Sequence, residues 1–285
     1  MVDTLVQRQV ARIDSPPISR RFWGLHRIRP LIPPGDWAFT DPFLLLMEDW
    51  FPDGVFDRHP HRGIETVTYV IDGGVEHYDN HGNEGTIAPG DARWLTAGRG
   101  LIHNEYPRDG GVAHTLQLWV NLPAKDKLVQ AHHQNLQAAS LPKRWERGAE
   151  LTVFSGSSGS VKASTTNHAP VTMVQIDLDK NISVELDVPA GYNGFVVVLK
   201  GDATIGTDPT AVKAVELAWL TASDDESSVQ LRAGDKGAKA LLIAGLPLRE
   251  SIAARGPFVM NTEDELQDGF SEYRAQGAQF GLQAL

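Results

Sequence analysis

Short segments rich in valine, isoleucine, leucine and aromatic residues recur along the whole chain, separated by glycine, proline and aspartate. Segments of this length and composition are typical of β-strands. In the first half they run from residues 43–46 to 114–120. After a polar connector at about 123–148, which we expect to be helical or irregular, they resume at 151–154, 171–178, 182–188, 195–199, 214–220 and 240–244. Many short strands at close spacing favour a sandwich or barrel, so we predict an all-β fold.

Two pairs of metal-capable side chains occur in the first half, in the patterns His59-Pro60-His61 and His103-Asn104-Glu105. Each pair is spaced i, i+2, so on a β-strand both side chains point to one face, roughly 7 Å apart. If the two strands pair, the four side chains converge. Three imidazoles and one carboxylate suit a divalent first-row metal, and the chain has no cysteine that could supply a thiolate.

The surrounding sequence favours such convergence. A single pair of this kind is more often a solvated pair on an exposed strand. Here a strand-like segment, 66–71, follows the first pair, and another, 93–96, precedes the second, with turn signals at 72–74 and 97–100. Both pairs therefore lie at strand ends within one antiparallel stretch.

Composition restricts the possible partners and location. The 285 residues are 41% hydrophobic and 22% charged, enough for two soluble domains with full cores. Apolar runs such as 195–199 have only strand length, and residues 1–5 show no signal-peptide pattern, so we expect no membrane span and a cytoplasmic location. The formal net charge of −10 argues against direct nucleic-acid binding and leaves a protein partner open.

The uneven distribution of histidine indicates how the chain divides. Nine of the ten histidines lie at or before His133, and only His168 follows. The segments 68–73 and 196–201 also resemble each other, since each is a strand that ends in a charged residue and glycine. We therefore predict two similar domains, 1–135 with the metal site and 136–285 without one.

A helix is expected at the carboxyl end of the second domain. Residues 261–265 combine a polar cap with an acidic first turn, and Leu266, Phe270 and Tyr273 keep helical spacing. This apolar stripe should pack on a barrel, because water would otherwise contact it.

The residues around both metal pairs resemble the pirin family. The matching stretches are HPHRGIETVTYVIDGG at 59–74, PGD at 89–91, Trp94, TAGRGLIHNE at 96–105, LQLWVNLP at 116–123 and GPFVMNT at 256–262. The resemblance implies a bicupin, with two antiparallel β-barrels of the cupin, or jelly-roll, type in tandem. It also implies one mononuclear divalent metal in the amino-terminal barrel, most often Fe²⁺, with copper, nickel, cobalt, manganese or zinc as alternatives. The ligands would be His59, His61, His103 and Glu105.

The carboxylate ligand has two candidates. Most cupins use a His-x-His-x₃-Glu arrangement, which here would select Glu65, whereas pirins resemble one another in using the second motif. On a continuous strand residues 59, 61 and 65 would all face the same way, so strand parity does not exclude Glu65. An interruption at Gly63 would remove this alignment. We favour Glu105, because a carboxylate at i+2 from His103 has no other evident use. Glu65 would then accept a hydrogen bond or end a strand.

Other polar and aromatic residues receive more ordinary interpretations. His77 and His81 could orient ligands, but hairpin histidines are more often solvated. The adjacent His132 and His133 should point apart. Trp94 and Trp119 could wall a pocket but are more often core, and Gln117 shares strand parity with Trp119. The Gly98-Arg99-Gly100 stretch is expected to be a tight turn.

Two functions follow from the resemblance. The first is a dioxygenase similar to cupin quercetinases, which would open the central ring of a flavonol or another small aromatic substrate with O₂, with Glu105 as the catalytic base at the metal. The second is a non-catalytic iron-binding regulator of a transcription factor or metabolic enzyme, in which the oxidation state of the metal changes a protein contact. An isomerase or lyase on the same scaffold is a third possibility. Two fused barrels are expected to act as a monomer.

Overall fold

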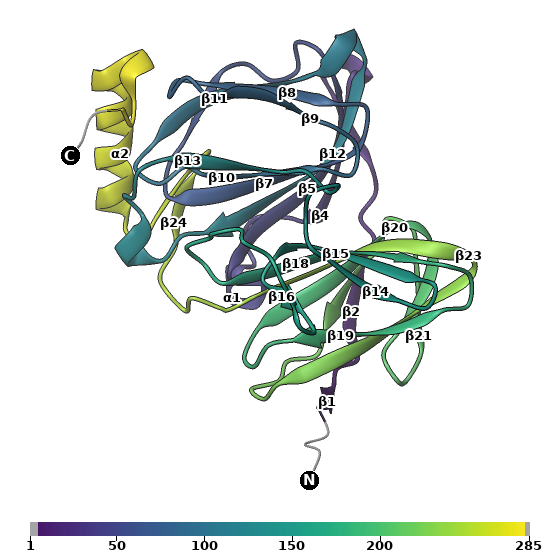
Figure 1. The fold of residues 1–285 in the computed structure, drawn as a ribbon. Helices are drawn as coiled ribbons and strands as arrows, with labels where there is room; N and C mark the ends of the chain where they lie inside the picture. Colours follow the sequence, from purple (N-terminus) through teal and green to yellow (C-terminus); the bar gives the residue numbers. More distant parts are fainter. Residues whose placement is uncertain (1–4, 283–285) are drawn as a thin grey trace. The chain divides into compact units, whose positions relative to one another are not determined.

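The computed structural model describes residues 5–282, which form two compact units of β-sheet (Figure 1). We call residues 17–137 and 248–282 the first barrel, and residues 5–16 and 138–247 the second barrel. Within residues 5–282, none of the helices has the length and apolar character needed to cross a membrane.

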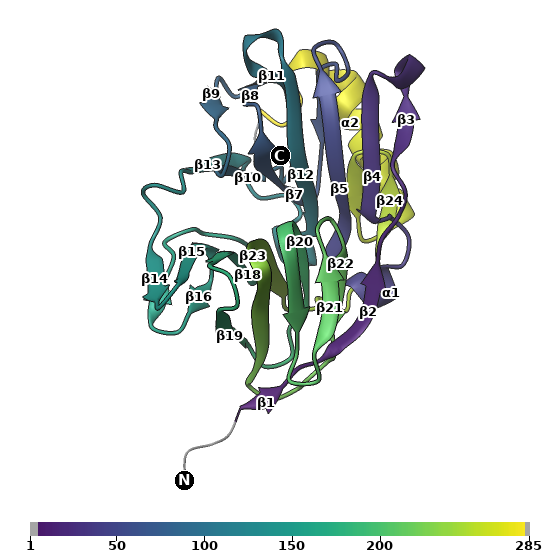
Figure 2. The ribbon, with the colours of Figure 1, turned by 90° about the vertical axis from the view of Figure 1, so that its right-hand side faces the viewer.

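Two antiparallel sheets face each other in the first barrel (Figures 1 and 2). The larger has the strand order β13-β10-β7-β12-β5-β4-β3, and the smaller has the order β6-β11-β8-β9. The strands are β3 (Ser19–Arg21), β4 (His26–Ile32), β5 (Phe43–Pro52), β6 (His59–His61), β7 (Ile64–Asp72), β8 (Val75–Asp79), β9 (Glu84–Ile87), β10 (Ala92–Thr96), β11 (Leu101–Pro107), β12 (Val112–Asn121) and β13 (His132–Leu136).

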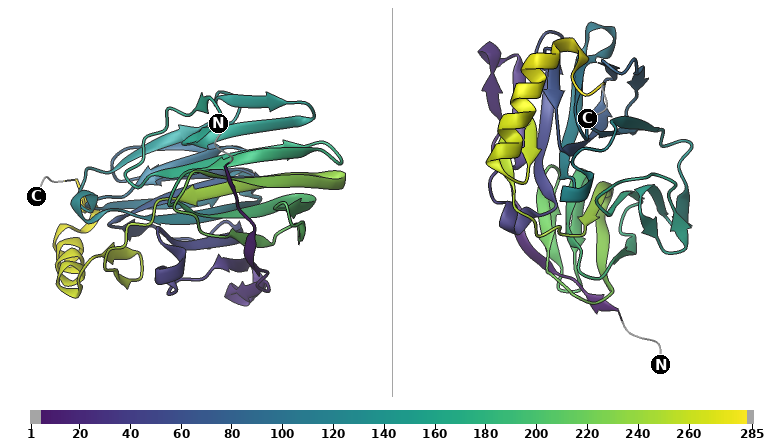
Figure 3. Two further views of the ribbon diagram at one scale, coloured as in Figure 1. Left: turned by 90° about the horizontal axis from the view of Figure 1, so that it is seen from below. Right: turned by 90° about the vertical axis from the view of Figure 1, so that its left-hand side faces the viewer.

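The first barrel also contains a hairpin, two helices and short 3-10 turns. They are the hairpin of β24 (Ala253–Arg255) and β25 (Phe258–Met260), the helices α1 (Trp37–Thr40) and α2 (Glu263–Gln276), and the 3-10 turns Phe22–Gly24, Arg108–Gly110, Ala124–Asp126 and Gly277–Gln279. Helix α2 begins with a capping box between Thr262 and Glu265. The helix, yellow in Figure 3, lies beside the hairpin of β24 and β25. Its expected apolar stripe packs against Phe258, Phe280 and Ile102, with Leu266 fully buried.

The second barrel is built on one ten-stranded sheet with the main order β14-β15-β18-β23-β20-β22-β2. Strands β1 and β19 also pair with β23, and β21 pairs with β20. The strands are β1 (Val6–Gln7), β2 (Val10–Asp14), β14 (Lys143–Glu146), β15 (Ala149–Ser155), β16 (Ser157–Ser158), β17 (Val161–Lys162), β18 (Val171–Leu178), β19 (Ser183–Val188), β20 (Asn193–Ile205), β21 (Thr210–Lys213), β22 (Leu217–Leu220) and β23 (Ser227–Gly245). Its core is aliphatic, with residues such as Leu151, Val196 and Leu242 fully buried.

The division of the chain differs from the predicted boundary between residues 135 and 136. The amino-terminal strands belong to the second barrel and the carboxyl-terminal helix belongs to the first, the reverse of the predicted assignment. Strands β1 and β2 pair with β23 and β22, and helix α2 packs on β24 and β25 of the first barrel. The connector at 123–148 also differs from expectation, because it contains strands β13 and β14. Strand pairing between segments so distant in sequence produces no local sequence pattern from which it could be predicted.

Gly63 separates the first histidine pair from the long strand that follows it. Its φ is +75°, and a Cβ there would lie 1.9 Å from the carbonyl oxygen of Val259. Only glycine fits this left-handed turn against the β25 backbone. As a result, β6 belongs to the smaller sheet and β7 to the larger one. The strand continuity that would have aligned Glu65 with His59 and His61 is broken here.

Candidate metal centre

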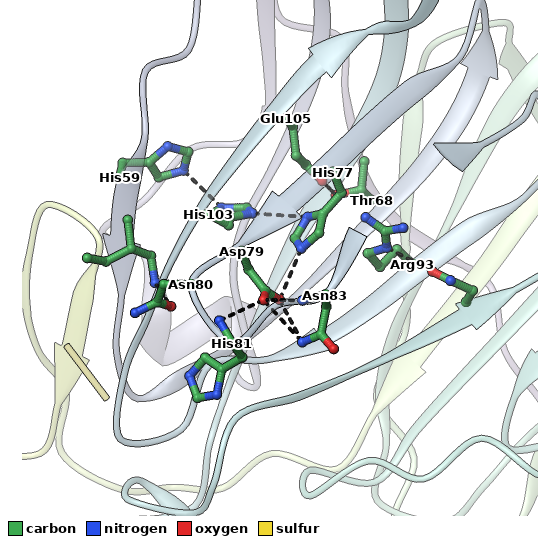
Figure 4. A network of polar contacts seen from close by, with 12 residues as sticks. His59, Thr68, His77, Asp79, Asn80, His81, Asn83, Arg93, His103 and Glu105 are labelled. Atoms are coloured by element: carbon green, nitrogen blue, oxygen red, sulfur yellow. Dashed lines mark hydrogen bonds and ion pairs between the residues drawn. The ribbon is translucent and has the colours of Figure 1, made fainter. Parts of the chain in front are cut away.

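Strands β6 and β11 bring three histidines together. They pair antiparallel, with His103 opposite His59 and Leu101 opposite His61. The Nε2 atoms of His59 and His103 lie 3.0 Å apart (Figure 4). Both rings are 4.9 Å from the ring of His61 between centroids. Ligand atoms from the three rings all lie within 4.8 Å of one another. The structure thus places His59, His61 and His103 in one cluster.

The state of these imidazoles suits metal ligation. Burial lowers the pKa of His61 and His103 well below the usual value, and neighbouring histidines add to the effect, so both rings are neutral at pH 7. Nδ1 of His59 is hydrogen-bonded to the Asp57 carbonyl at 2.8 Å, which leaves Nε2 as the ligand atom. Two nitrogens held at right angles, about 2.0–2.1 Å from one ion, are roughly 2.9 Å apart. The observed 3.0 Å spacing between His59 and His103 matches this value.

His61 supplies a further test of fit to a metal. Its side chain is 1% exposed, yet neither ring nitrogen has a well-formed hydrogen bond within the described chain. An unpaired polar atom in a buried position is costly, and a metal ion is one partner that would relieve the cost. The donor set of three imidazoles therefore fits a divalent ion.

Glu105 enters the barrel from the same strand as His103 and is 6% exposed. Its carboxylate accepts hydrogen bonds from Thr68 Oγ1 and Gln117 Nε2, each at 3.0 Å. Burial raises its pKa, and the nearby charge of Arg93 and the Thr68 hydrogen bond act in the opposite direction. A carboxylate oxygen of Glu105 lies within 4.8 Å of ligand atoms of His103 and His77, in a second group that shares His103 with the first.

Glu65 lies on the other face of β7. Thr68 on this strand points toward Glu105, and residues three positions apart on a strand face opposite ways. Glu65 is fully buried and accepts a hydrogen bond from Thr96 Oγ1 at 2.8 Å. The geometry therefore favours Glu105 over Glu65 as a carboxylate near the histidine cluster.

Two rows of side chains, one from each sheet, enclose this part of the barrel. In the smaller sheet Glu105 lies opposite His77, and His77 opposite Gly85. In the larger sheet the row is Gln117, Thr68, Arg93 and Asn135, each directly opposite the next on neighbouring strands. The hydrogen bonds from Thr68 and Gln117 to Glu105 join the two rows.

His77 is buried, contrary to the expectation of a solvated hairpin histidine. It is 2% exposed, and its Nδ1 lies 3.4 Å from Nδ1 of His103. Its Nε2 lies 3.3 Å from Asp79 Oδ2, and Asn83 and the His81 backbone donate hydrogen bonds to Asp79 (Figure 4). His77 and Asp79 have the same i, i+2 spacing as the two metal pairs, which is the signal that could have revealed them.

Trp119 forms one wall beside the histidines. Its ring meets His61 edge-to-face at 5.1 Å, and its indole N–H donates to Gln117 Oε1 at 3.2 Å, as their shared strand parity predicts. Trp119 also lines a cavity of about 410 Å³, together with Pro34, Trp37, Leu44, Leu45, Ala254, Gly256 and Val259. Trp94, in contrast, is fully buried core.

The GPFVMNT segment near the carboxyl end holds the turn after His61 in place. Arg62 N–H donates to the Pro257 carbonyl at 3.3 Å, and Val259 N–H donates to the Arg62 carbonyl at 3.0 Å. The ammonium of Lys127 donates to Gly63 O at 2.8 Å, to Val259 O at 3.0 Å and to Asn121 Oδ1 at 2.5 Å. Burial lowers the pKa of Lys127 to about 7. Nothing in the sequence pattern indicated this lysine.

The remaining candidates lie outside the cluster. His81, His132 and His133 are partly buried, and the ring of His133 lies 6.4 Å from that of His77. Gly98 and Gly100 have positive φ, as a tight turn requires. Within residues 5–282, both groups of His and carboxylate side chains with metal-site spacing lie in the first barrel.

Comparison with known proteins agrees with the fold and the motifs. Residues 37–120 match the pirin family model, and residues 173–280 match the model of the pirin C-terminal cupin domain. Human pirin is 37% identical over 251 residues, which cover 87% of this chain and 86% of the human protein. Two antiparallel β-barrels with these matches define a bicupin, a member of the cupin superfamily.

Solved structures narrow the class further. The crystal structure of GK1651 from Geobacillus kaustophilus is 43% identical, with a TM-score of 0.84, and the match covers 87% of this chain and 99% of that one. A structure of quercetin 2,3-dioxygenase from Acinetobacter baumannii is 30% identical, with a TM-score of 0.76 and coverage of 95% and 96%. The chain belongs to the pirin family.

Proposed function

We propose that this pirin is a metal-dependent dioxygenase that opens a flavonol-type ring with O₂, at a mononuclear site formed by His59, His61, His103 and Glu105. The observation that carries the proposal is the convergence of three imidazoles, with Glu105 entering the same barrel interior two residues after His103. The similarity to a quercetin 2,3-dioxygenase over nearly the whole chain supports it.

The donor set accommodates Fe²⁺ and equally copper, nickel, cobalt, manganese or zinc. When bound, such an ion acts as a Lewis acid toward a substrate hydroxyl and, if redox-active, supports reaction with O₂. His59, His61 and His103 would hold it through ring nitrogens, and Asp57 and His77 would orient two of these rings.

Glu105 is the residue to which we assign proton transfer. Thr68 and Gln117 fix its carboxylate beside His103, out of bulk water. In this position it would accept the proton of the flavonol 3-hydroxyl, which leaves an electron-rich anion for oxidation. The indole of Trp119 and the apolar cavity behind it offer a surface on which flat aromatic rings can pack.

The test is to purify the protein anaerobically, to measure its metal content, and to load it separately with each candidate metal. Addition of quercetin or a related flavonol should then cause oxygen uptake and carbon monoxide release, because dioxygenation that opens the central ring releases one of its carbons as carbon monoxide. The matched control is His103→Ala, which should show neither. Absence of uptake with every flavonol and every metal form would contradict the proposal.

A regulator is the second candidate. The absence of cysteine leaves a metal as the redox-sensitive group, and the net charge of −10 would suit a basic protein partner. This function requires a partner whose affinity differs between the ferrous and ferric forms, because a switch without differential affinity shifts no equilibrium. Equal partner binding by the two forms would exclude it.

A further inference from the structure

Arg93 is a buried cation in the barrel interior, and within residues 5–282 no carboxylate forms a hydrogen bond with it. It lies on β10 directly opposite Thr68, so it shares the face that points toward Glu105. The residue is 1% exposed. Its Nε donates to Asn135 Oδ1 at 2.8 Å, while Nη1 and Nη2 have no hydrogen-bond partner among the described residues.

Such an arrangement is costly unless something completes it. A guanidinium keeps its charge under essentially all conditions, and a buried charge without a partner is strongly destabilising. Glu105 lies close enough to interact electrostatically with Arg93, but its own hydrogen bonds come from Thr68 and Gln117. The two terminal nitrogens of Arg93 are therefore available to a ligand.

A glycine lies beside Nη2, so no side chain covers this nitrogen from strand β9. Gly85 on β9 faces it, and a Cβ at that position would lie 3.2 Å from Nη2. Strands β9 and β13, which carry Gly85 and Asn135, are the edge strands of the two sheets (Figure 2). Asn135 is exposed and Gly85 is partly exposed, so this side of Arg93 is the one nearest solvent.

We propose that Arg93 binds the carboxylate of an aromatic carboxylic acid at the site next to His103 and Glu105. Because Nε is engaged by Asn135, the free donors are Nη1 and Nη2, a fork that matches the two oxygens of a carboxylate. The inference takes the location of the site from the proposed function and goes beyond it, because a flavonol carries no carboxylate and Arg93 would admit a second class of ligand to the same site.

The first experiment measures binding to the metal-free protein, so its result does not depend on turnover. The probes are 4-fluorobenzoate and its neutral analogue 4-fluorobenzamide, followed by ¹⁹F NMR. Benzoate should bind at least 10-fold more tightly than benzamide. Equal affinities, or displacement of benzoate by sulfate at the same concentration, would overturn the assignment, because either result would show a site that does not recognise a carboxylate.

Variants then identify the residue. Arg93→Gln should weaken benzoate binding at least 10-fold, and Arg93→Lys, which keeps the charge but loses the fork, should give an intermediate value. Arg108→Gln removes an exposed arginine of the same barrel and should leave binding unchanged. Unaltered benzoate binding by Arg93→Gln would overturn the proposal.

A measurement on the unmodified protein covers the case in which Arg93→Gln does not fold. With ¹⁵N-labelled arginine, benzoate should shift the Nε–H resonance of Arg93, assigned from the spectrum of Arg93→Lys. A titration that shifts only exposed arginines would refute the assignment. Benzoate binding without any flavonol oxidation would remove the flavonol proposal and keep this one, whereas flavonol oxidation without benzoate binding would do the reverse.

Discussion

His59 and His103 face each other across strands β6 and β11, with their Nε2 atoms 3.0 Å apart. Two ring nitrogens at this distance can share at most one proton between them. A divalent ion can take both lone pairs instead. The spacing between strands is set by backbone pairing, so this approach of the two nitrogens is a property of the folded sheet.

Replacing any one histidine of the cluster should therefore remove most of the bound metal. His59→Ala, His61→Ala and His103→Ala should each bind well below one ion per chain while remaining folded, measured by elemental analysis and circular dichroism. His168→Ala, in the second barrel, is the matched control and should keep full metal. Full occupancy in His61→Ala would remove this residue from the ligand set.

The two candidate carboxylates should behave differently. Glu65 is hydrogen-bonded to Thr96 on the far face of β7, so Glu65→Gln should retain the metal content of the unmodified protein. Glu105→Ala should lose a large part of it, because a ligand is removed. Metal analysis of both variants, prepared side by side, makes the comparison. Loss of metal from Glu65→Gln equal to that from Glu105→Ala would reverse the choice.

His77 should act as a positioning residue for His103. Its Nδ1 lies at hydrogen-bond distance from Nδ1 of His103, and its Nε2 contacts Asp79 Oδ2. This arrangement leaves Nε2 of His103 as the nitrogen that can bind the metal. His77→Phe should weaken metal affinity by roughly 10- to 100-fold, measured by competition with a chelator. His77→Gln, which keeps a hydrogen-bonding group, should recover part of the loss.

A purely structural role of His77 predicts a different outcome. In that case the metal-free variants would lose thermal stability while the affinity of the folded fraction stayed the same. His81→Phe, which changes a neighbouring and less buried histidine, provides the control for local disturbance.

Lys127 should make stability depend on pH above neutrality. Burial places its pKa at about 7 in the folded protein, against 10.5 in the unfolded chain, with Glu250 and Glu265 opposing the shift. Between these values the unfolded state holds a proton that the folded state lacks, so this residue makes the protein more stable as pH rises from about 7 to 10. Below pH 7 both states are protonated and the contribution is constant.

Urea unfolding in the presence of a chelator measures this effect. The difference in free energy of unfolding between the protein and Lys127→Met should change by up to about 1.4 kcal/mol per pH unit in that range. Lys125→Met, at an exposed neighbouring lysine, should show no such slope. A difference that is flat from pH 7 to 9 would mean that Lys127 keeps an ordinary pKa.

The sequence predicted those parts of the site that depend on local spacing. The i, i+2 pairs on β6 and β11 are periodic features of single strands, and antiparallel pairing was enough to bring His59 and His103 together. Arg93 and His77 depend instead on register between strands. Arg93 lies in a row of side chains across β7, β10 and β13, and His77 lies in a row across β11, β8 and β9. Each row forms only when the strands pair in the correct register.

The ends of the chain were unpredictable for a similar reason. The helical spacing of Leu266, Phe270 and Tyr273 shows that α2 has an apolar face but not which barrel covers it. The barrel is determined by contacts with Phe258 and Ile102. Ile102 is far from the helix in sequence, and Phe258 is separated from it by a turn. Lys127 likewise becomes significant only when Gly63 and Val259 meet.

The final prediction concerns turnover by Glu105. If Glu105 accepts the proton of the substrate hydroxyl, Glu105→Gln should reduce flavonol-dependent oxygen uptake by roughly 10²-fold or more, because the amide keeps the shape and an oxygen donor but cannot serve as the base. Thr68 and Gln117 hold the carboxylate, and an amide at the same place keeps most of these contacts, so the metal should be largely retained. Gln117→Met, which removes one of these hydrogen bonds, should cost less than Glu105→Gln, since the base remains. Turnover is measured by oxygen electrode at matched metal content. Undiminished oxygen uptake by metal-loaded Glu105→Gln would show that the proton leaves by another route and that Glu105 serves only to hold the ion.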